Sequence, residues 1–194
     1  MLMKVTRLEL DGLVLIELAA YPDERGFFIE RYHAGKFREH GLPTEFVQDN
    51  HSRSKPRVIR ALHYQADPPQ GKLVGVLRGC ILDVAVDIRS DSPTFGRHVA
   101  IELSGENARL LWIPPGFAHG FCVLGDEHAD VLYKVTAPYN PATEGGILWN
   151  DPELKITWPV DNPILSAKDQ RLMTFAQYRA RPVAWNAEGS TGKE

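Results

Sequence analysis

Apolar residues recur in short runs between positions 72 and 135, and turn-forming residues separate the runs. Several runs alternate apolar and polar positions, as around Val84 and Val86, which is the period-2 pattern of a strand with one buried face. Glycine and proline fall between the runs, where turns are expected. Many short strands at close spacing predict an all-β sandwich or barrel. The predicted strands are 72–77, 80–88, 97–103, 109–113, 119–124 and 129–135.

Two other segments carry helical signals. Residues 34–40 predict a short helix. A later helix is predicted to begin near Ser166, because Ser166 and Asp169 resemble a capping box in which Asp replaces the usual Glu. Apolar residues then recur at helical spacing at Leu172, Phe175 and Ala176. We therefore expect a few short peripheral helices around the β-structure.

The composition describes an ordinary globular chain. Of the 194 residues, 43% are hydrophobic and 24% are charged, which excludes a disordered chain, a collagen and a coiled coil. The 14 prolines and 16 glycines suit a fold with many turns. No repeat or linker divides the sequence, so we predict a single domain over 1–180. A C-terminal tail over 181–194 follows, and its last residues are predicted to be frayed.

Charge and cysteine content narrow the classes of partner. The net charge of −3 gives no electrostatic reason to expect nucleic acid or a membrane surface. No run approaches the roughly 20 apolar residues of a membrane span, and the N-terminus does not resemble a signal peptide. The two cysteines, Cys80 and Cys122, are too few for a disulfide scaffold or a thiolate metal cage. We expect a cytoplasmic protein.

Familiar catalytic motifs are missing, but polar residues interrupt the apolar strands at four places. The sequence has no glycine-rich phosphate loop, no nucleophile elbow and no His-x-His pair, which is the spacing that a metal site on a β-barrel usually shows. We therefore predict no metal. The four polar segments supply imidazoles, a phenol and hydrogen-bonding groups suited to a polar cavity and to general acid–base chemistry. They are residues 48–52, 60–65, 114–120 and 130–134.

Each candidate residue also has a purely structural interpretation. A single strand histidine such as His63 is more often structural than catalytic, and Tyr133 shares its face with apolar neighbours that are typical of a core. Lys72 can be a solvated strand end, Asp169 a helix cap, and Arg25 part of a turn. The residues alone leave both interpretations open.

Read in order, the motifs resemble one family. They are residues 23–28 (DERGFF), 46–52 (FVQDNHS), 60–65 (RALHYQ), 70–74 (QGKLV), 83–89 (DVAVDIR), 92–96 (SPTFG), 111–121 (LWIPPGFAHGF), 133–134 (YK), 149–152 (WNDP) and 165–169 (LSAKD). In this order they resemble the dTDP-4-dehydrorhamnose 3,5-epimerases, and the resemblance extends from about Val5 to Phe175.

The resemblance implies a cupin-type jelly-roll barrel without metal or cofactor, usually a homodimer. The implied substrate is dTDP-4-dehydro-6-deoxy-D-glucose and the product dTDP-4-dehydro-L-rhamnose. On the matching positions, His63 corresponds to the general base and Asp169 to its partner. Lys72 corresponds to the donor to the C4 oxygen as it becomes an enolate, and Tyr133 to the acid that protonates the opposite face.

The resemblance also implies the residues that hold the nucleotide sugar. These are Arg25, Glu30, Gln48, Asp49, Asn50, Arg60, His119, Tyr139, Glu144 and Lys168, with Tyr139 stacked on thymine. Strict alternation along a strand puts Arg60 and His63 on opposite faces, so either a bulge intervenes or Arg60 reaches the substrate around an edge.

Three positions depart from the family pattern, and they leave the stereochemical outcome open. Ala61 stands where the family has Gly, and its extra methyl could narrow the cavity. Gly75 and Gly145 stand where the family often has Arg, so a contact to the nucleotide could be lost beside Glu144. The alternatives are a single-site epimerase or ketoisomerase, a non-catalytic cupin that binds a nucleotide sugar, and a metal-dependent cupin.

Overall fold

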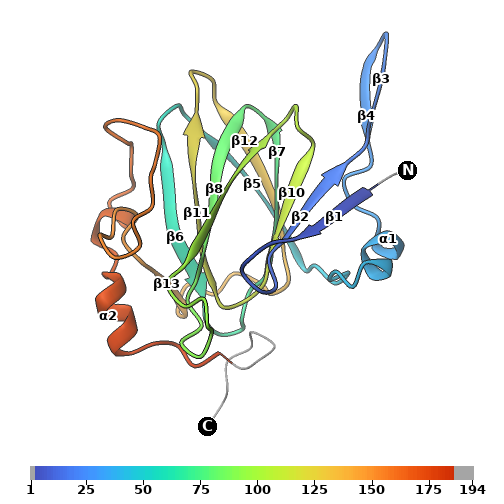
Figure 1. Cartoon of the computed structure of the whole chain (residues 1–194). Coiled ribbons are helices and arrows are strands. Elements are labelled where there is room, and N and C mark those ends of the chain that lie inside the picture. The colour runs from blue at the N-terminus through green and yellow to red at the C-terminus, as the bar shows by residue number, and fades with distance from the viewer. Residues whose placement is uncertain (1–2, 186–194) are drawn as a thin grey trace.

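The computed structural model describes residues 3–185, and its body consists of two antiparallel β-sheets that face each other (Figure 1). The six-stranded sheet contains, in spatial order, β1 (Met3–Arg7), β2 (Val14–Leu18), β10 (Arg109–Ile113), β7 (Lys72–Arg78), β12 (Ala129–Val135) and β5 (Gln48–Ser54). The five-stranded sheet contains β13 (Glu144–Gly146), β6 (Ile59–Gln65), β11 (Phe117–Leu124), β8 (Cys80–Asp87) and β9 (His98–Ser104). This arrangement confirms the predicted all-β jelly roll.

The remaining elements lie outside the two sheets. A separate hairpin of β3 (Ala20–Asp23) and β4 (Gly26–Ile29) projects from the body, and α1 (Ala34–Glu39) follows it, close to the predicted helix at 34–40. None of the helices between residues 3 and 185 has the length and apolar content needed to cross a membrane.

The strands predicted from position 72 onward are present, and two of them, β10 and β12, have the predicted bounds. The strands before position 72 carry weaker signals. For example, β5 reads QDNHSRS and has only one fully buried residue, Ser54, so it lacks the apolar alternation that marks a strand in the sequence.

Three apolar clusters hold these layers together. The first fills the space between the sheets and includes Val74, Leu111 and Phe121. The second covers the outer face of the five-stranded sheet with the C-terminal segment, where Tyr178 and Trp185 pack. The third lies on the outer face of the six-stranded sheet around Phe37 of α1 and its neighbours. Because both faces of the sheets are partly covered, β11 is buried along most of its length and shows no alternation.

The predicted late helix is wrong in its extent. The segment after Ser166 forms only a short 3-10 turn, η1 (Asp169–Arg171), whose N-cap is Lys168. Ser166 Oγ, just before this turn, accepts the backbone N–H of Asp169 at 3.0 Å. The second helix, α2 (Phe175–Ala180), starts separately and has its own capping box between Thr174 and Gln177. The extended backbone of Leu172 and Thr174 interrupts the apparent helical spacing.

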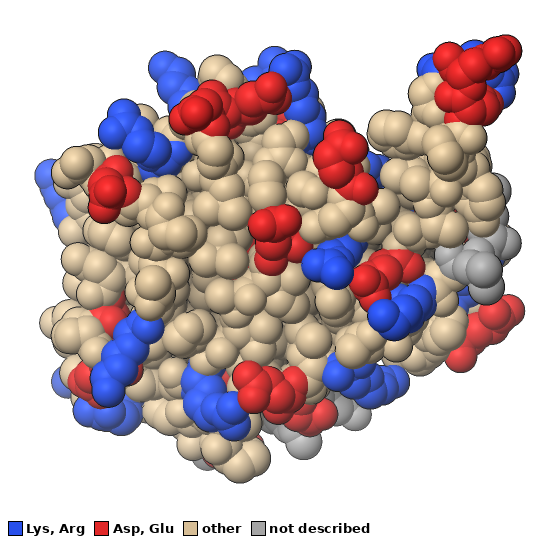
Figure 2. Space-filling model, turned by 45° about the horizontal axis from the view of Figure 1, so that its top comes forward, with Lys and Arg blue, Asp and Glu red and all other residues tan. Residues whose placement is uncertain are grey.

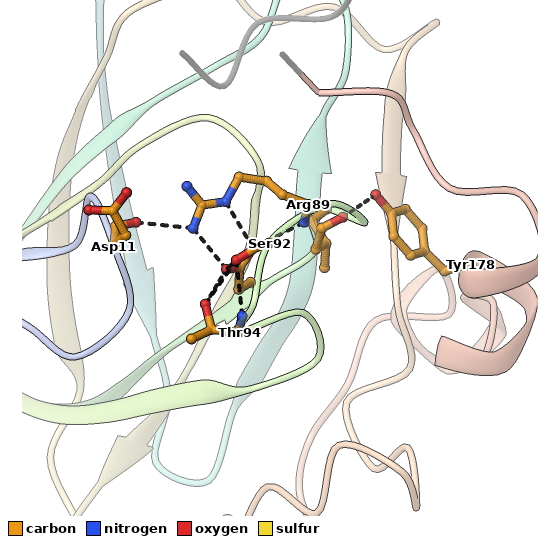
Figure 3. A network of polar contacts seen from close by, with 7 residues as sticks. Asp11, Arg89, Ser92, Thr94 and Tyr178 are labelled. Atoms are coloured by element: carbon orange, nitrogen blue, oxygen red, sulfur yellow. Dashed lines mark hydrogen bonds and ion pairs between the residues drawn. The ribbon is translucent and has the colours of Figure 1, made fainter. Parts of the chain in front are cut away.

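A buried ion-pair network joins the C-terminal segment to the body. The carboxylate of Asp87, at the end of β8, accepts hydrogen bonds from Arg89, Ser92 and Thr94. Arg89 also donates to the carbonyl of Asp11, and Tyr178 of α2 donates to the carbonyl of Ile88 at 2.8 Å (Figure 3). Segments that are distant in the sequence therefore meet at one turn.

The tail predicted from position 181 begins within this packed structure. Val183 and Trp185 pack in the outer cluster, and Trp185 Nε1 donates to Tyr178 Oη at 3.1 Å. The prediction of frayed last residues falls on 186–194, which lie outside the described residues.

Candidate active site

A cavity of about 520 Å³ opens between the two sheets. Its wall contains the predicted residues Arg60, His63, Lys72, His119, Tyr133, Lys168 and Asp169. The rest of the wall is formed by Ser52, Val58, Ile59, Phe121, Ile164, Leu165 and Ser166. The fold thus brings together residues that lie up to 117 positions apart, from Ser52 to Asp169.

His63 and Asp169 form an oriented pair in this wall. His63 Nε2 lies 2.8 Å from Asp169 Oδ1, and the Asp169 side chain is only 5% exposed. Burial raises the pKa of Asp169, but the hydrogen bonds from His63 and Ser166 outweigh burial, and the resulting pKa is below the usual value. A carboxylate fixed on Nε2 holds the imidazole in one tautomer and leaves Nδ1 as the nitrogen that can take a proton.

Lys72 brings a cationic group to the same cavity. Its Nζ lies 3.4 Å from the backbone oxygen of His63. Burial lowers the pKa of Lys72 from 10.5 to about 8, against the opposing charges of Glu144 and Asp83. Lys72 is therefore an ammonium at neutral pH, and it titrates close to that range.

Tyr133 lies on the wall opposite His63. His63 belongs to β6 of the five-stranded sheet, whereas Tyr133 belongs to β12 of the six-stranded sheet, and both line the cavity. Burial raises the pKa of Tyr133, so its hydroxyl stays protonated at neutral pH. A molecule between the two sheets would meet an imidazole on one side and a phenol on the other.

A bulge in β6 explains how Arg60 and His63 share a cavity. The pairing of β6 with β11 changes register between His119, opposite His63, and Phe121, opposite Arg60. The extra residue in β6 resets the alternation, so of the two alternatives, a bulge or a reach around the edge, the structure shows the bulge. Arg60 Nε then donates to Ser54 Oγ at 3.0 Å, which orients the guanidinium.

His119 belongs to a second histidine–carboxylate pair. Its Nε2 is 2.9 Å from Oδ2 of Asp83 on β8, and both residues are buried. The sequence motif at 83–89 contains Asp83, but nothing in that motif distinguishes its role from that of the neighbouring strand residues. Asp83 Oδ1 and Ser52 Oγ are the buried side-chain atoms without a hydrogen-bond partner in the described part of the chain.

The predicted residues of β5 divide between its two faces. Gln48 and Asn50 share a strand face with Ser52, which lines the cavity, and Gln48 Nε2 donates to Asn50 Oδ1 at 2.8 Å. Asp49 lies on the opposite face, where Lys134 donates to it at 2.9 Å. Asp49 therefore points away from the cavity of its own chain.

Tyr139, Glu144 and Lys168 form a cluster next to the cavity. Glu144 Oε2 accepts hydrogen bonds from Tyr139 Oη, at 2.8 Å, and from Lys168 Nζ. Tyr139 is 55% exposed, and Gln48 Oε1 accepts its backbone N–H at 3.1 Å. This cluster carries an exposed aromatic ring beside a cation and an anion.

Arg25 and Glu30 lie outside this cavity. Arg25 is at the β3–β4 turn, where it pairs with Asp23 and is largely exposed. Glu30 follows β4 and pairs with Lys36. The hairpin that carries Arg25 extends away from the body in both views (Figures 1 and 2), so neither residue completes the cavity of its own chain.

The three departures from the family pattern lie away from the cavity wall. Ala61 is fully buried, and its methyl faces Gly120 rather than the cavity. A side chain at Gly145 would collide with the Tyr64 ring, and one at Gly75 would meet Leu110 on the outer side of the six-stranded sheet. The expectation that Ala61 narrows the cavity is therefore wrong.

The apolar part of the wall was missed by sequence reasoning. Val58, Phe121 and Ile164 have no chemistry that distinguishes them from core residues in a sequence. A backbone bridge between Val58 and Ile164 brings the C-terminal loop over this side of the cavity. Within residues 3–185 no group of three His, Cys, Asp or Glu side chains has a metal-binding arrangement.

The chain is similar in sequence to known sugar-nucleotide epimerases. The family model described as dTDP-4-dehydrorhamnose 3,5-epimerase matches residues 7–177. An enzyme of that name from Pseudomonas aeruginosa is 53% identical over 176 residues, covering 90% of this chain and 97% of the relative. A dTDP-4-dehydrorhamnose 3-epimerase from Streptomyces niveus is 38% identical, covering 91% and 86%.

A solved structure extends the comparison to three dimensions. The Legionella pneumophila dTDP-6-deoxy-D-glucose-3,5-epimerase, crystallised with dTDP-4-keto-L-rhamnose, is 50% identical, with a TM-score of 0.85. The match covers 89% of this chain and 92% of the other. Since the family model spans most of the sequence and the cavity unites the motif residues, the chain belongs to the dTDP-4-dehydrorhamnose 3,5-epimerase family.

Proposed function

We propose that the protein is an isomerase that converts dTDP-4-dehydro-6-deoxy-D-glucose to dTDP-4-dehydro-L-rhamnose by inverting C3 and C5. The observation that carries this proposal is the placement of His63 and Tyr133 on opposite walls of one cavity, with the Lys72 ammonium in the same cavity. Inversion of a carbon needs a base on one face and an acid on the other.

The first half of the reaction is removal of a proton next to the C4 ketone. His63 takes the proton on Nδ1, because Asp169 occupies Nε2. The electron pair of the broken C–H bond moves to the C4 oxygen, and Lys72 donates a hydrogen bond to the resulting enolate. One donor of this kind is typically worth about 3–4 kcal/mol of barrier.

The second half is protonation from the other side. Tyr133 transfers its hydroxyl proton to the carbanion carbon, so the configuration inverts and no atoms are gained or lost. Solvent then reprotonates the phenolate and removes the proton from His63. The same cycle at the second carbon completes the reaction.

The remaining predicted residues suit the nucleotide. Arg60, His119 and Lys168 supply cationic or hydrogen-bonding groups for the diphosphate. Gln48 and Asn50 supply amides on the same side, Glu144 organises the cluster, and the exposed Tyr139 ring suits stacking on thymine.

A homodimer is part of this proposal. The projecting hairpin exposes Phe27 and Phe28, which are 61% and 59% exposed, and adjacent exposed aromatic residues are typical of an interface. Arg25 and Glu30 flank this apolar pair, so they can contribute to substrate binding only across such an interface. Asp49 faces away from the cavity of its own chain, so it too can contribute to substrate binding only across such an interface.

We also propose a cytoplasmic location. Cys80 and Cys122 are both free thiols in the structure, which suits a reducing compartment. A small-molecule nucleotide sugar in the cavity is the proposed partner besides the second copy.

The single-site epimerase remains a second candidate, because a 38% identical relative is a 3-epimerase. Incubation with substrate in D₂O, followed by proton NMR, separates the possibilities. Deuterium at both C3 and C5 is the expected result. Deuterium at one carbon only would contradict the 3,5 assignment, and tight binding without exchange would identify a non-catalytic binding protein.

The base assignment is tested in the same assay with His63→Ala. We expect dTDP binding to persist, while exchange falls by roughly 10²–10⁴-fold, the usual contribution of a general base. His98→Ala is the matched control, because His98 lies on β9 and is not part of the cavity wall. Unchanged exchange in His63→Ala would exclude His63 as the base.

A further inference from the structure

A second histidine–carboxylate pair lies beside the first, and the proposed reaction leaves its carboxylate without a role. His119 is the direct partner of His63 across β11 and β6. Its Nε2 is 2.9 Å from Asp83 Oδ2. Asp83 is 0% exposed and His119 is 8% exposed. The carboxylate therefore reaches no ligand directly and acts only through its neighbours.

The second oxygen of Asp83, Oδ1, points to a further interaction of this carboxylate. Oδ1 is buried and has no hydrogen-bond partner among residues 3–185. A buried carboxylate with an unpaired oxygen is costly unless a positive charge lies close by. Lys72 brings a positive charge to the cavity that His119 also lines, and its Nζ lies 3.4 Å from the backbone oxygen of His63, the residue paired with His119. The negative charge of Asp83 acts on the pKa of Lys72 in the direction that favours the ammonium.

The other carboxylates around Lys72 already have hydrogen-bond partners. Asp169 is held by His63, and Glu144 by Tyr139 and Lys168. The remaining titratable or cationic groups of the cavity wall are Arg60, His119 and Tyr133. Asp83 is thus the carboxylate near Lys72 that keeps a buried oxygen without a donor.

We propose that Asp83 is a positioning residue for the reaction, which holds the His119 ring in one orientation and supplies the buried counter-charge for the Lys72 ammonium. This proposal rests on the proposed epimerase function. His119 then presents Nδ1 to the bound diphosphate sugar, and Lys72 stays charged next to the C4 oxygen. One buried carboxylate in this way links the group that binds the nucleotide to the group that stabilises the enolate.

The test is Asp83→Asn, which keeps an oxygen acceptor for His119 and removes the charge. The rate of exchange in D₂O is measured as kcat from pH 6 to pH 10. Loss of the negative charge destabilises the Lys72 ammonium, so the basic limb of the profile should move to lower pH by roughly one unit. At pH values above the limb, kcat should then be about tenfold lower than in the wild type.

Asp87→Asn is the matched control. Asp87 lies on the same strand and is also 0% exposed, but its carboxylate is held by Arg89, Ser92 and Thr94 outside the cavity. This variant should lose stability and keep the wild-type basic limb. An unmoved limb in folded Asp83→Asn, or the same displacement in both variants, would overturn the proposal.

A measurement on the wild-type protein covers the case in which Asp83→Asn does not fold. Nitrogen-15 NMR of the imidazoles, with His119 assigned by its loss in His119→Gln, reports which ring nitrogen carries the proton. The proposal requires a protonated Nε2 hydrogen-bonded to a carboxylate, and a bare Nε2 would overturn it. This readout needs no turnover, so failure of the epimerase function itself would appear separately, as absence of exchange in the wild type.

Discussion

At the scale of single residues, Lys72 combines a functional advantage with a cost in stability. Burial of its ammonium lowers its pKa to about 8, so the charged form is disfavoured in the folded protein relative to water. The same burial strengthens any hydrogen bond that it donates to an enolate. The burial that suits Lys72 to its proposed role therefore makes the folded protein less stable.

The pH dependence of the rate follows from this residue. In the proposed reaction Lys72 must be protonated to stabilise the enolate, and Asp169, with its lowered pKa, stays ionised throughout the neutral range. We expect kcat to decrease as pH rises through about 8, the pKa of Lys72. A pH–rate profile of isotope exchange checks this, and a plateau up to pH 10 would contradict the proposed role of Lys72.

The free energy of unfolding should respond to pH in the opposite direction to kcat. The folded-state pKa of Lys72 lies below its usual value of 10.5, so between about pH 8 and pH 10.5 the unfolded chain binds more protons. The contribution of Lys72 to the free energy of unfolding therefore rises over that window. Below it, the full cost of the buried charge is present.

Lys72→Met separates the two effects at pH 7. We expect exchange to fall by roughly 10²–10³-fold, while the free energy of unfolding rises by about 1–3 kcal/mol, because a buried charge is removed. Urea denaturation measures the stability. Lys4→Met, at an exposed lysine paired with Glu17, is the control and should change stability by less than about 0.5 kcal/mol.

At the scale of elements, the contact between β6 and β11 determines the arrangement of the cavity wall. The bulge in β6 turns Arg60 and His63 to the same side. Gly120 of β11 makes room for it, because a Cβ at this position would lie 2.3 Å from Ala61 Cβ and 2.7 Å from the backbone oxygen of Arg60. A small residue in one strand thus permits the irregularity in its neighbour.

Gly120→Ala should consequently disturb both packing and function. We expect a loss of about 1–3 kcal/mol in the free energy of unfolding, which is typical of overpacking, together with slower exchange as the bulge shifts. In the double variant with Ala61→Gly the methyl–methyl contact is gone, and part of the stability should return. Full wild-type stability of Gly120→Ala in urea denaturation would show that the bulge does not depend on this glycine.

At the scale of the whole molecule, the two sheets act as the two sides of the site. Each sheet supplies one member of the proposed proton-transfer pair, and the C-terminal loop adds Asp169 to the five-stranded side. The hairpin with Phe27 and Phe28 lies away from this centre. It is therefore available for association without altering the cavity of its own chain.

Phe28→Glu tests the proposed homodimer. A carboxylate in place of the exposed Phe28 ring should shift the protein from dimer to monomer, because burying a charge in an apolar interface is costly. Light scattering coupled to size-exclusion chromatography measures the mass. Met173→Glu, at an exposed methionine of the C-terminal segment, is the control and should remain a dimer. A wild-type mass for Phe28→Glu would exclude this hairpin as the interface.

The sequence by itself determined the fold class and most of the chemical groups. Alternating apolar runs and turn residues predict strands because the side-chain period of a strand is visible locally. Ordered motifs then identified His63, Lys72, Tyr133 and Asp169, which the structure brings into one cavity. The separate start of α2 at Thr174 was missed, because helical spacing alone does not reveal an extended backbone between two turns.

Only the tertiary structure decided which faces these groups occupy. The bulge in β6, the outward direction of Asp49 and the distance of Arg25 from the cavity depend on strand pairing, which a one-residue change in register reverses. The free oxygen of Asp83 likewise becomes apparent only when its neighbours from other strands are known. Local sequence encodes periodicity and chemistry, whereas proximity arises from contacts between distant segments.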